Sequence, residues 1–217
     1  MEFYLDTANL EEIKKYLDLG IVDGVTTNPS LIAKEKGVDY SQRIKEITEL
    51  VSGPVSAEVI STDYEGMLKE AEKYNSISSN VYVKLPCTSE GIKALKTLKT
   101  KGIKVNMTLV FTASQALICA KNGADLISPF IGRLDDISRD GLNLINELAL
   151  IWAQYNFSSK ILVASIRSPQ QVVESAKMGA HVATIPPKLI DKLLHHPLTD
   201  SGLEKFIQDY KNATSTN

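Results

Sequence analysis

The stretch Asn80-Val-Tyr-Val-Lys-Leu-Pro-Cys87 places a lysine in the middle of an apolar, strand-like run. Residues of this kind favour a β-strand, in which an ammonium ion has no evident structural role. Removal of Lys84 from water disfavours its charged form, so we expect its pKa to lie below the ordinary value of about 10.4. A neutral amine attacks carbonyl carbons to form Schiff bases, which makes Lys84 a candidate nucleophile. The alternative is a lysine at a strand end with a buried stem and its amine in water.

Runs similar to this one recur along the chain, at 3–7, 24–28, 55–60, 81–86, 104–110, 126–132, 160–166 and 181–185. Segments with helical periodicity separate them, at 9–17, 40–51, 64–74, 89–101, 113–121, 141–155 and 169–178. Strands that alternate with helices indicate parallel β–α–β units, and eight such strands predict a closed (β/α)₈ TIM barrel of the α/β class. A doubly wound open sheet is the alternative fold.

The end of the chain has a helical pattern of its own, with apolar residues at Leu203, Phe206, Ile207 and Tyr210. We expect an extra C-terminal helix that ends near Asn212 and packs on the barrel or on a neighbouring subunit. No linker or change of composition divides the sequence, so we expect a single barrel domain over 1–212. The tail, 213–217, is expected to be disordered.

The composition favours small molecules as partners. The 217 residues carry a formal net charge of −2 with both signs mixed along the chain, and 43% of them are hydrophobic. No basic cluster predicts binding to nucleic acid, and no run approaches 18 apolar residues, so we expect no nucleic-acid partner and no membrane association. Cys87 and Cys119 are too few for a disulfide framework and lack the spacing of metal ligands, which fits a cytoplasmic protein.

Side chains alternate between the two faces of a strand, and this alternation separates polar from apolar positions here. In the run 81–86, Lys84 lies on the face opposite to the valines. We expect the apolar faces, including Leu109, Leu162 and Ala164, to meet the helices. The predicted inner set consists of Asp6, Thr26, Asn28, Glu58, Lys84, Asn106, Thr108, Ser128, Ser165 and Arg167. Buried polar groups on this scale cost stability, so we interpret them as an active site at the C-terminal strand ends rather than a structural ion network.

Two arginines are candidates for a phosphate site. Arg133 follows the sixth predicted strand, and Arg167 ends the seventh beside Ser165, near the place where barrels often bind phosphate. Either arginine alone is more typical of a solvated surface. Together, and facing Lys84, they indicate an anionic substrate such as a sugar phosphate, and their charge is expected to lower the lysine pKa further.

Motifs at successive strand ends also carry a family resemblance. They are Phe3-Tyr-Leu-Asp-Thr-Ala-Asn9, Gly24-Val-Thr-Thr-Asn-Pro-Ser30, Val83-Lys-Leu-Pro86, Asn106-Met-Thr108 and Ser128-Pro-Phe-Ile-Gly-Arg133. Over essentially its whole length, the chain resembles the small transaldolases, the subfamily that includes the fructose-6-phosphate aldolases. The resemblance implies a barrel enzyme of the class I aldolase type that works without a metal or an organic cofactor.

The resemblance also implies roles for individual residues. It makes Lys84 the Schiff-base lysine, Asp6 the acid/base carboxylate, and Glu58 with Thr108 the pair that holds a catalytic water. It assigns substrate contacts to Asn28, Asn106, Ser128, Phe130, Arg133, Ser165 and Arg167, the last three at the phosphate. The three histidines form no ligand cluster in this arrangement, so we expect no metal site.

Two positions distinguish the branches of this family. Transaldolases have glutamate and phenylalanine where the aldolases have glutamine and tyrosine, and this chain has Glu58 and Phe130. The resemblance therefore implies transfer of a dihydroxyacetone unit from fructose 6-phosphate or sedoheptulose 7-phosphate to erythrose 4-phosphate or glyceraldehyde 3-phosphate, in the non-oxidative pentose phosphate pathway. The alternative is a fructose-6-phosphate aldolase that releases free dihydroxyacetone. The family likeness further implies a homo-oligomer, either a pentamer or a decamer.

Two other functions are compatible with a buried lysine and nearby arginines. In a pyridoxal-phosphate enzyme, Lys84 would hold the cofactor and the arginines its phosphate, and the purified protein would be yellow. A sugar-phosphate binder without catalysis would bind its ligand but form no imine. The combination of Asp6, Glu58 and Lys84 favours catalysis over binding alone.

Overall fold

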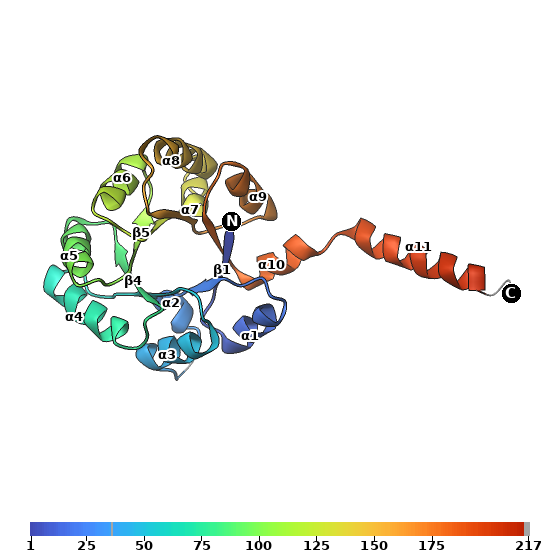
Figure 1. Ribbon diagram of the computed structural model, residues 1–217, viewed down its shortest axis with the longest axis horizontal. Helices are drawn as coiled ribbons and strands as arrows, with labels where there is room; N and C mark the ends of the chain where they lie inside the picture. The colour runs from blue at the N-terminus through green and yellow to red at the C-terminus, as the bar shows by residue number, and fades with distance from the viewer. Residues whose placement is uncertain (36, 215–217) are drawn as a thin grey trace.

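Eight parallel strands close into a barrel in the computed structural model, which describes residues 1–35 and 37–214 (Figure 1). The strands are β1 (Glu2–Asp6), β2 (Gly24–Thr26), β3 (Val55–Glu58), β4 (Val81–Pro86), β5 (Val105–Val110), β6 (Leu126–Pro129), β7 (Lys160–Val163) and β8 (Val182–Ile185). Each strand pairs with its neighbour in the sequence, and β8 pairs with β1 to close the sheet. The (β/α)₈ prediction is confirmed, because the eight strands form a closed barrel.

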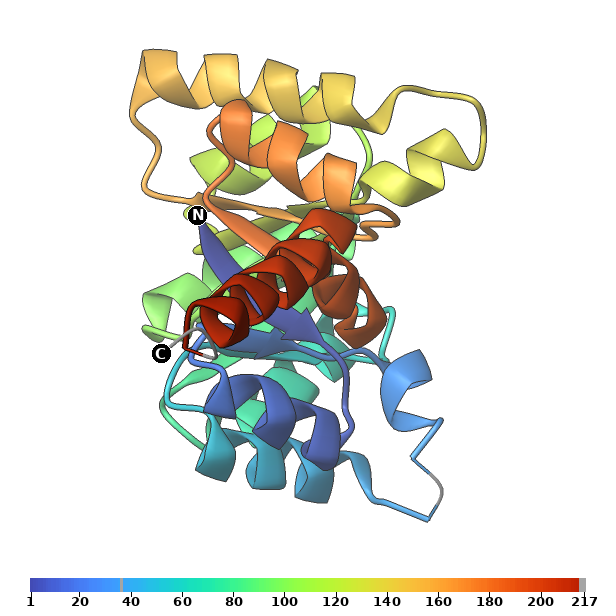
Figure 2. The ribbon, with the colours of Figure 1, turned by 90° about the vertical axis from the view of Figure 1, so that its right-hand side faces the viewer.

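Helices surround the barrel on its outer side (Figures 1 and 2). They are α1 (Leu10–Asp18), α2 (Pro29–Ile32), α3 (Tyr40–Leu50), α4 (Tyr64–Asn75), α5 (Ser89–Thr100), α6 (Ala113–Lys121), α7 (Ile131–Asp135), α8 (Gly141–Tyr155), α9 (Pro169–Lys177) and α10 (Pro187–Leu194). A further helix, α11 (Pro197–Thr214), does not pack on the barrel. Short polar side chains begin many of the helices. Asn9, for example, accepts a hydrogen bond from the Glu12 amide, as its sequence position predicts. The short helices α2 and α7 and helix α10 were not expected from the sequence.

The interior of the barrel is divided into an apolar half and a polar half. Buried residues that point inward form a cluster of their own, made of Tyr4, Leu126, Leu162, Ala164 and Val182, with Tyr82 and Phe130 packed against it. The opposite faces of the strands join the larger core beneath the helices. The apolar cluster fills much of the barrel, so the polar inner residues gather toward the carboxyl ends of the strands.

The structure corrects the expected orientation of the seventh strand. Leu162 and Ala164 face the barrel interior rather than the helices, because both belong to the inner cluster. Strand β7 ends at Val163, and Ser165 has a positive φ of 61°. This left-handed residue interrupts the alternation, so Ser165 also reaches the interior although Ala164 precedes it directly. Simple alternation predicts opposite faces for two such neighbours.

A second departure lies in β5. The pairing register between β5 and β6 shifts between Met107 and Val110, and Leu109 has a positive φ of 56°. Leu109 consequently borders a cavity beside Lys84 instead of packing under the helices, as the alternation predicted. A β-bulge re-aims side chains in this way at the rims of barrels.

The sixth strand is shorter than the sequence pattern indicates. It ends at Pro129, and the chain turns at once into α7, so Arg133 lies on a short helix rather than beyond a long strand. Gly132 permits this turn, because a Cβ at that position would lie 2.0 Å from the carbonyl oxygen of Ser165. The close approach joins the ends of β6 and β7 and brings Arg133 near Ser165.

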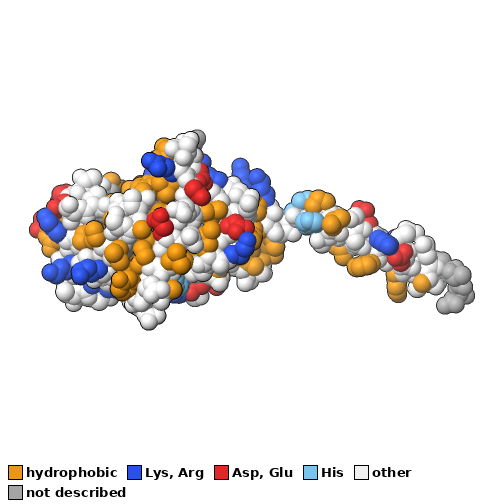
Figure 3. Space-filling model, turned by 90° about the horizontal axis from the view of Figure 1, so that it is seen from above, with side chains coloured by type: hydrophobic (Ala, Val, Ile, Leu, Met, Phe, Trp, Pro, Cys, Tyr) orange, Lys and Arg blue, Asp and Glu red, His pale blue; other side chains and the backbone are white. Residues whose placement is uncertain are grey.

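Helix α11 extends away from the barrel (Figures 1 and 3). None of its residues is buried, so the expected packing on the subunit's own barrel is wrong. The helix continues to Thr214, which makes residues 213 and 214 helical, and the rest of the tail predicted to be disordered, 215–217, lies outside the described residues. Among the residues that the structure describes, no helix combines the length and apolar character needed to cross a bilayer.

Candidate active site

Lys84 lies at the centre of a row of polar residues on three adjacent strands. The register pairs Glu58 of β3 with Lys84 of β4, and Lys84 with Asn106 of β5. The Lys84 amine forms an ion pair with the Glu58 carboxylate at 3.0 Å and donates a hydrogen bond to the Thr27 carbonyl oxygen at 3.3 Å. Only 6% of the lysine side chain is exposed, so the alternative of an amine in bulk water is wrong. A charge buried this deeply needs such partners.

Asp6 provides a second carboxyl group near the lysine. It accepts a hydrogen bond from the Thr26 hydroxyl at 2.9 Å. Burial raises the pKa of Asp6 above its ordinary range, although the nearby Lys84 and the hydrogen bond from Thr26 act in the opposite direction. A carboxyl group with a raised pKa is a stronger base than an ordinary aspartate once it has lost its proton.

A chain of hydrogen bonds joins the polar residues on the other side of the lysine. The Ser128 hydroxyl donates to the Asn106 side-chain oxygen at 2.7 Å, and the Asn106 amide donates to Ser56 Oγ at 3.1 Å. Thr108 lies two residues beyond Asn106 on β5, and its buried hydroxyl has no hydrogen-bond partner among the described residues. An unsatisfied buried hydroxyl costs roughly 1–3 kcal/mol, so the site is suited to a water or substrate group that would satisfy it.

Two cavities border the lysine. The smaller one, of about 130 Å³, is lined by Asp6, Thr26, Asn28, Lys84, Ser128, Phe130, Arg133, Leu162, Ala164, Ser165 and Thr184. The larger one, of about 430 Å³, is lined by Asn28, Pro29, Ser30, Leu31, Lys34, Glu58, Lys84, Leu109, Phe130 and Arg133. The carboxyl groups of Asp6 and Glu58 border different cavities, Asp6 the smaller one and Glu58 the larger one. A ligand that spans both would pass Lys84.

Only two of the three residues predicted to bind phosphate lie at the same cavity. Arg133 borders both cavities, with its guanidinium carbon 5.0 Å from the centre of the Phe130 ring, and Ser165 lines the smaller cavity. Arg167 is not part of either lining. Its guanidinium forms an ion pair with Asp136 at 2.7 Å, and 54% of its side chain is exposed. The expectation that Arg167 belongs to the barrel interior is therefore wrong for this structure.

Two further residues complete the surroundings and were missed in the sequence. The Thr184 hydroxyl lies 2.5 Å from that of Thr26 and lines the smaller cavity; alternation along the eighth strand would have indicated it, since Thr184 shares a face with Val182. Tyr40 accepts a hydrogen bond from the Glu58 backbone amide at 2.8 Å. Tyr40 lies on α3, and no local pattern links it to β3.

The closed barrel of eight parallel strands is a TIM barrel, and its polar residues lie at the carboxyl ends of the strands, where TIM-barrel enzymes have their active sites. The chain belongs to the transaldolase/fructose-6-phosphate aldolase family, which it matches over residues 3–217. A protein of Clostridioides difficile named "Probable transaldolase" is 53% identical, and the alignment covers 99% of each chain. Proteins with the same name from Methanococcus maripaludis and Methanococcus vannielii are 55% and 57% identical, over 99% and 97% of this chain and 100% and 97% of their own.

The raised pKa of Asp6 predicts a pH-dependent cost in stability. The folded protein holds this proton more tightly than the unfolded chain does. The contribution of Asp6 to the free energy of unfolding therefore falls as pH rises from the unfolded pKa of about 3.9 through the folded pKa. Asparagine keeps the acceptor for Thr26 but does not ionise. We expect Asp6→Asn to raise the free energy of unfolding at neutral pH, and the difference from the native chain to vanish at acidic pH. Urea unfolding across this pH range measures it.

The matched control is Asp209→Asn on exposed α11, which should show no such trend. A stability difference for Asp6→Asn that is absent at neutral pH, or that grows toward acidic pH, would contradict the assignment.

Proposed function

We propose that this chain is a transaldolase that transfers a dihydroxyacetone unit between sugar phosphates. The donor is fructose 6-phosphate or sedoheptulose 7-phosphate, and the acceptor is erythrose 4-phosphate or glyceraldehyde 3-phosphate, as in the non-oxidative pentose phosphate pathway of the cytoplasm. The observation that carries the proposal is the buried Lys84 amine, which borders two cavities and is paired with Glu58. The names of the relatives support the same assignment.

In the first step, Lys84 attacks the C2 carbonyl of the ketose phosphate. The ion pair at 3.0 Å gives the ammonium group a carboxylate to which it can pass a proton, and the resulting amine is the nucleophile. A water held by Glu58 and the unpartnered Thr108 hydroxyl carries protons as the carbinolamine loses water. The product is an iminium ion on Lys84.

In the second step, Asp6 takes the proton from the C4 hydroxyl. The C3–C4 bond breaks, its electrons move into the iminium ion, and the aldose phosphate leaves. The raised pKa of Asp6 suits this role, since the same group must return the proton when the acceptor adds. Asn28, Asn106 and Ser128 bind sugar hydroxyls along this path; Asn28 and Ser128 border the smaller cavity, and Asn106 is joined to Ser128 by a hydrogen bond.

The phosphate group binds at Arg133 and Ser165. Arg133 borders both cavities, and Ser165 reaches the smaller one through its left-handed backbone. Arg167 joins them when the phosphate competes with Asp136 for its guanidinium. Both members of that ion pair are more than half exposed, so it is weak enough to exchange.

The residues Glu58 and Phe130 favour transfer over simple cleavage. A phenol at position 130 could hold or protonate a water near the bound enamine and promote release of free dihydroxyacetone, whereas a phenyl ring has no such group. Phe130 borders both cavities, where it lies close to any intermediate on Lys84. The three-carbon unit then remains bound until an aldehyde acceptor arrives.

Replacement of Lys84 by methionine tests the nucleophile. Lys84→Met keeps an unbranched side chain but removes the amine, so we expect sugar transfer to fall to the uncatalysed background. Borohydride added with fructose 6-phosphate should attach the three-carbon unit irreversibly to Lys84 in the native chain, as seen by peptide mass spectrometry. Lys104→Met, directly before β5 and therefore at the opposite end of the barrel, is the matched control and should retain both activity and labelling. Persistent turnover in Lys84→Met would exclude the mechanism, and tight sugar-phosphate binding without trapping would indicate a binding protein.

Dependence on an acceptor tests the proposed branch of the family. Fructose 6-phosphate should release glyceraldehyde 3-phosphate only when erythrose 4-phosphate is present. Phe130→Tyr should raise the acceptor-independent release about tenfold, which corresponds to one added hydrogen bond of about 1.4 kcal/mol. A coupled assay for glyceraldehyde 3-phosphate measures both rates. Equal release by the native chain without the acceptor would identify a fructose-6-phosphate aldolase.

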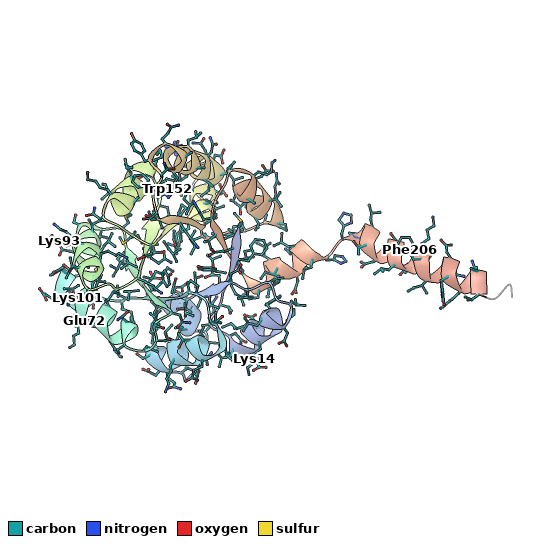
Figure 4. The ribbon with its side chains drawn as sticks, viewed as in Figure 1. Lys14, Glu72, Lys93, Lys101, Trp152 and Phe206 are labelled. Atoms are coloured by element: carbon teal, nitrogen blue, oxygen red, sulfur yellow. The ribbon has the colours of Figure 1, made fainter. Side chains whose placement is uncertain are left out.

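We also propose that the chain forms a homo-oligomer in which α11 contacts a neighbouring subunit. Leu203, Phe206, Ile207 and Tyr210 share one side of this helix and are between 55% and 72% exposed. Figure 3 shows hydrophobic side chains along the extended helix, and Figure 4 shows Phe206 far from the barrel. An apolar stripe of this kind on an extended helix is typical of subunit contacts.

Substitutions in full-length protein test this contact. Leu203→Ser, Phe206→Ser and Ile207→Ser combined should reduce the molar mass in light scattering, because they remove the apolar surface that would be buried. Gln208→Ser and Asp209→Ser together change other positions of the same helix and should leave the mass of the native assembly unchanged. A native chain that is monomeric, or a triple variant that assembles normally, would contradict the proposal.

A further inference from the structure

Two cysteines that are distant in the sequence meet next to the active-site strands. Cys87 follows β4 directly, and Cys119 lies near the end of α6. Their sulfur atoms are 3.5 Å apart, and both are free thiols. No part of the proposed reaction uses them. A disulfide bond is about 2.05 Å long, so the pair would have to approach by about 1.5 Å to close.

The two thiols differ in a way that suits stepwise oxidation. Cys87 is partly exposed, whereas Cys119 is completely buried. The hydrogen bond between them lowers the pKa of Cys87 and raises that of Cys119, which is further raised by burial. Cys87 also precedes the N-terminus of α5, where the helix dipole favours a thiolate. Cys87 is thus the thiol that a small oxidant reaches, and Cys119 is positioned behind it.

We propose that Cys87 and Cys119 are a redox-active pair that closes to a reversible disulfide within one chain when hydrogen peroxide oxidises Cys87. The Cys87 thiolate attacks one peroxide oxygen, the O–O bond breaks, and hydroxide leaves, which produces a sulfenic acid. The Cys119 sulfur then attacks the Cys87 sulfur, the S–O bond breaks, and water leaves with the Cys119 proton. Two thiols lose two electrons in total, and one peroxide is reduced to two waters.

Closure of this pair acts on the active site through a tightly packed turn. The Cys87 backbone amide donates to the Thr108 carbonyl oxygen at 2.9 Å, and Lys84 lies three residues before Cys87, on β4. The first turn of α5 packs closely against the end of β4, since a Cβ on Gly91 would lie 2.0 Å from the Pro86 carbonyl oxygen. We therefore expect the approach of the sulfur atoms to displace the end of β4. A displacement on the ångström scale can reduce catalysis by up to about 10²-fold.

Oxidation of the full-length protein with hydrogen peroxide tests the pair. We expect both thiols to disappear from a count made after unfolding, and the intact chain to lose the mass of two hydrogen atoms. Peptide mapping without reductant should join the segments that carry Cys87 and Cys119, and dithiothreitol should restore both thiols. Two surviving thiols, a disulfide between two chains, or a Cys87 sulfenic acid that accumulates in the native chain would each overturn the proposal.

Single substitutions separate the two steps. In Cys119→Ala the resolving thiol is absent, so Cys87 should stop at a sulfenic acid that dimedone labels. In Cys87→Ala, the buried Cys119 should survive the same treatment; this change at a partly exposed site also provides the control if Cys119→Ala does not fold. Loss of the Cys119 thiol in Cys87→Ala at the native rate would contradict the assignment of Cys87 as the first thiol.

The effect on catalysis is measured separately and rests on the proposed function. Transaldolase turnover should fall at least several-fold in the disulfide form and return with dithiothreitol. Unchanged turnover in fully cross-linked protein would overturn the link between the pair and the active site. A protein without transaldolase activity would refute the proposed function but leave the thiol measurements valid, so the two failures are distinguishable.

Discussion

The ion pair between Lys84 and Glu58 is the interaction on which this site depends. An ammonium ion inside a barrel is expensive unless a carboxylate and further hydrogen bonds replace its water. The pair forms because the register places Glu58 directly beside Lys84 on the adjacent strand, and the Thr27 carbonyl supplies the additional acceptor. Closure of the sheet holds both strands in this register. A slip by one residue would move one of the two charges to the helix side of the sheet.

The barrel interior is apolar at one end and polar at the carboxyl ends of the strands. Large apolar side chains such as Tyr4 and Leu126 fill the interior away from the site. The carboxyl ends of the strands contain groups that reduce stability, including the buried Asp6 and the unpartnered Thr108 hydroxyl. Such groups are expected at a functional site, where stability is exchanged for reactivity. The apolar half and the outer core provide the stability that this arrangement requires.

Local irregularities of the backbone shape the site as much as the regular strands do. Leu109 and Ser165 both have left-handed backbone conformations, and each borders a cavity. Regular strand alternation would point these side chains away from the cavities. Cys87 and Cys119 meet through tertiary packing, since one directly follows β4 and the other lies on α6. Arg167 pairs with the exposed Asp136, and no residue of α11 is buried, so both lie outside the packed barrel interior.

The sequence by itself determined the eight-stranded barrel, the burial of Lys84 and the gathering of most polar inner residues, because hydrophobic alternation and strand spacing are local properties of the chain. It also carried the family resemblance, which the matches to known proteins confirm. Only the tertiary structure decided the inward orientation of Leu162, the pairing of Arg167 with Asp136, and the contact between the two cysteines. These features depend on bulges, left-handed residues and the packing of distant segments, for which periodicity contains no signal.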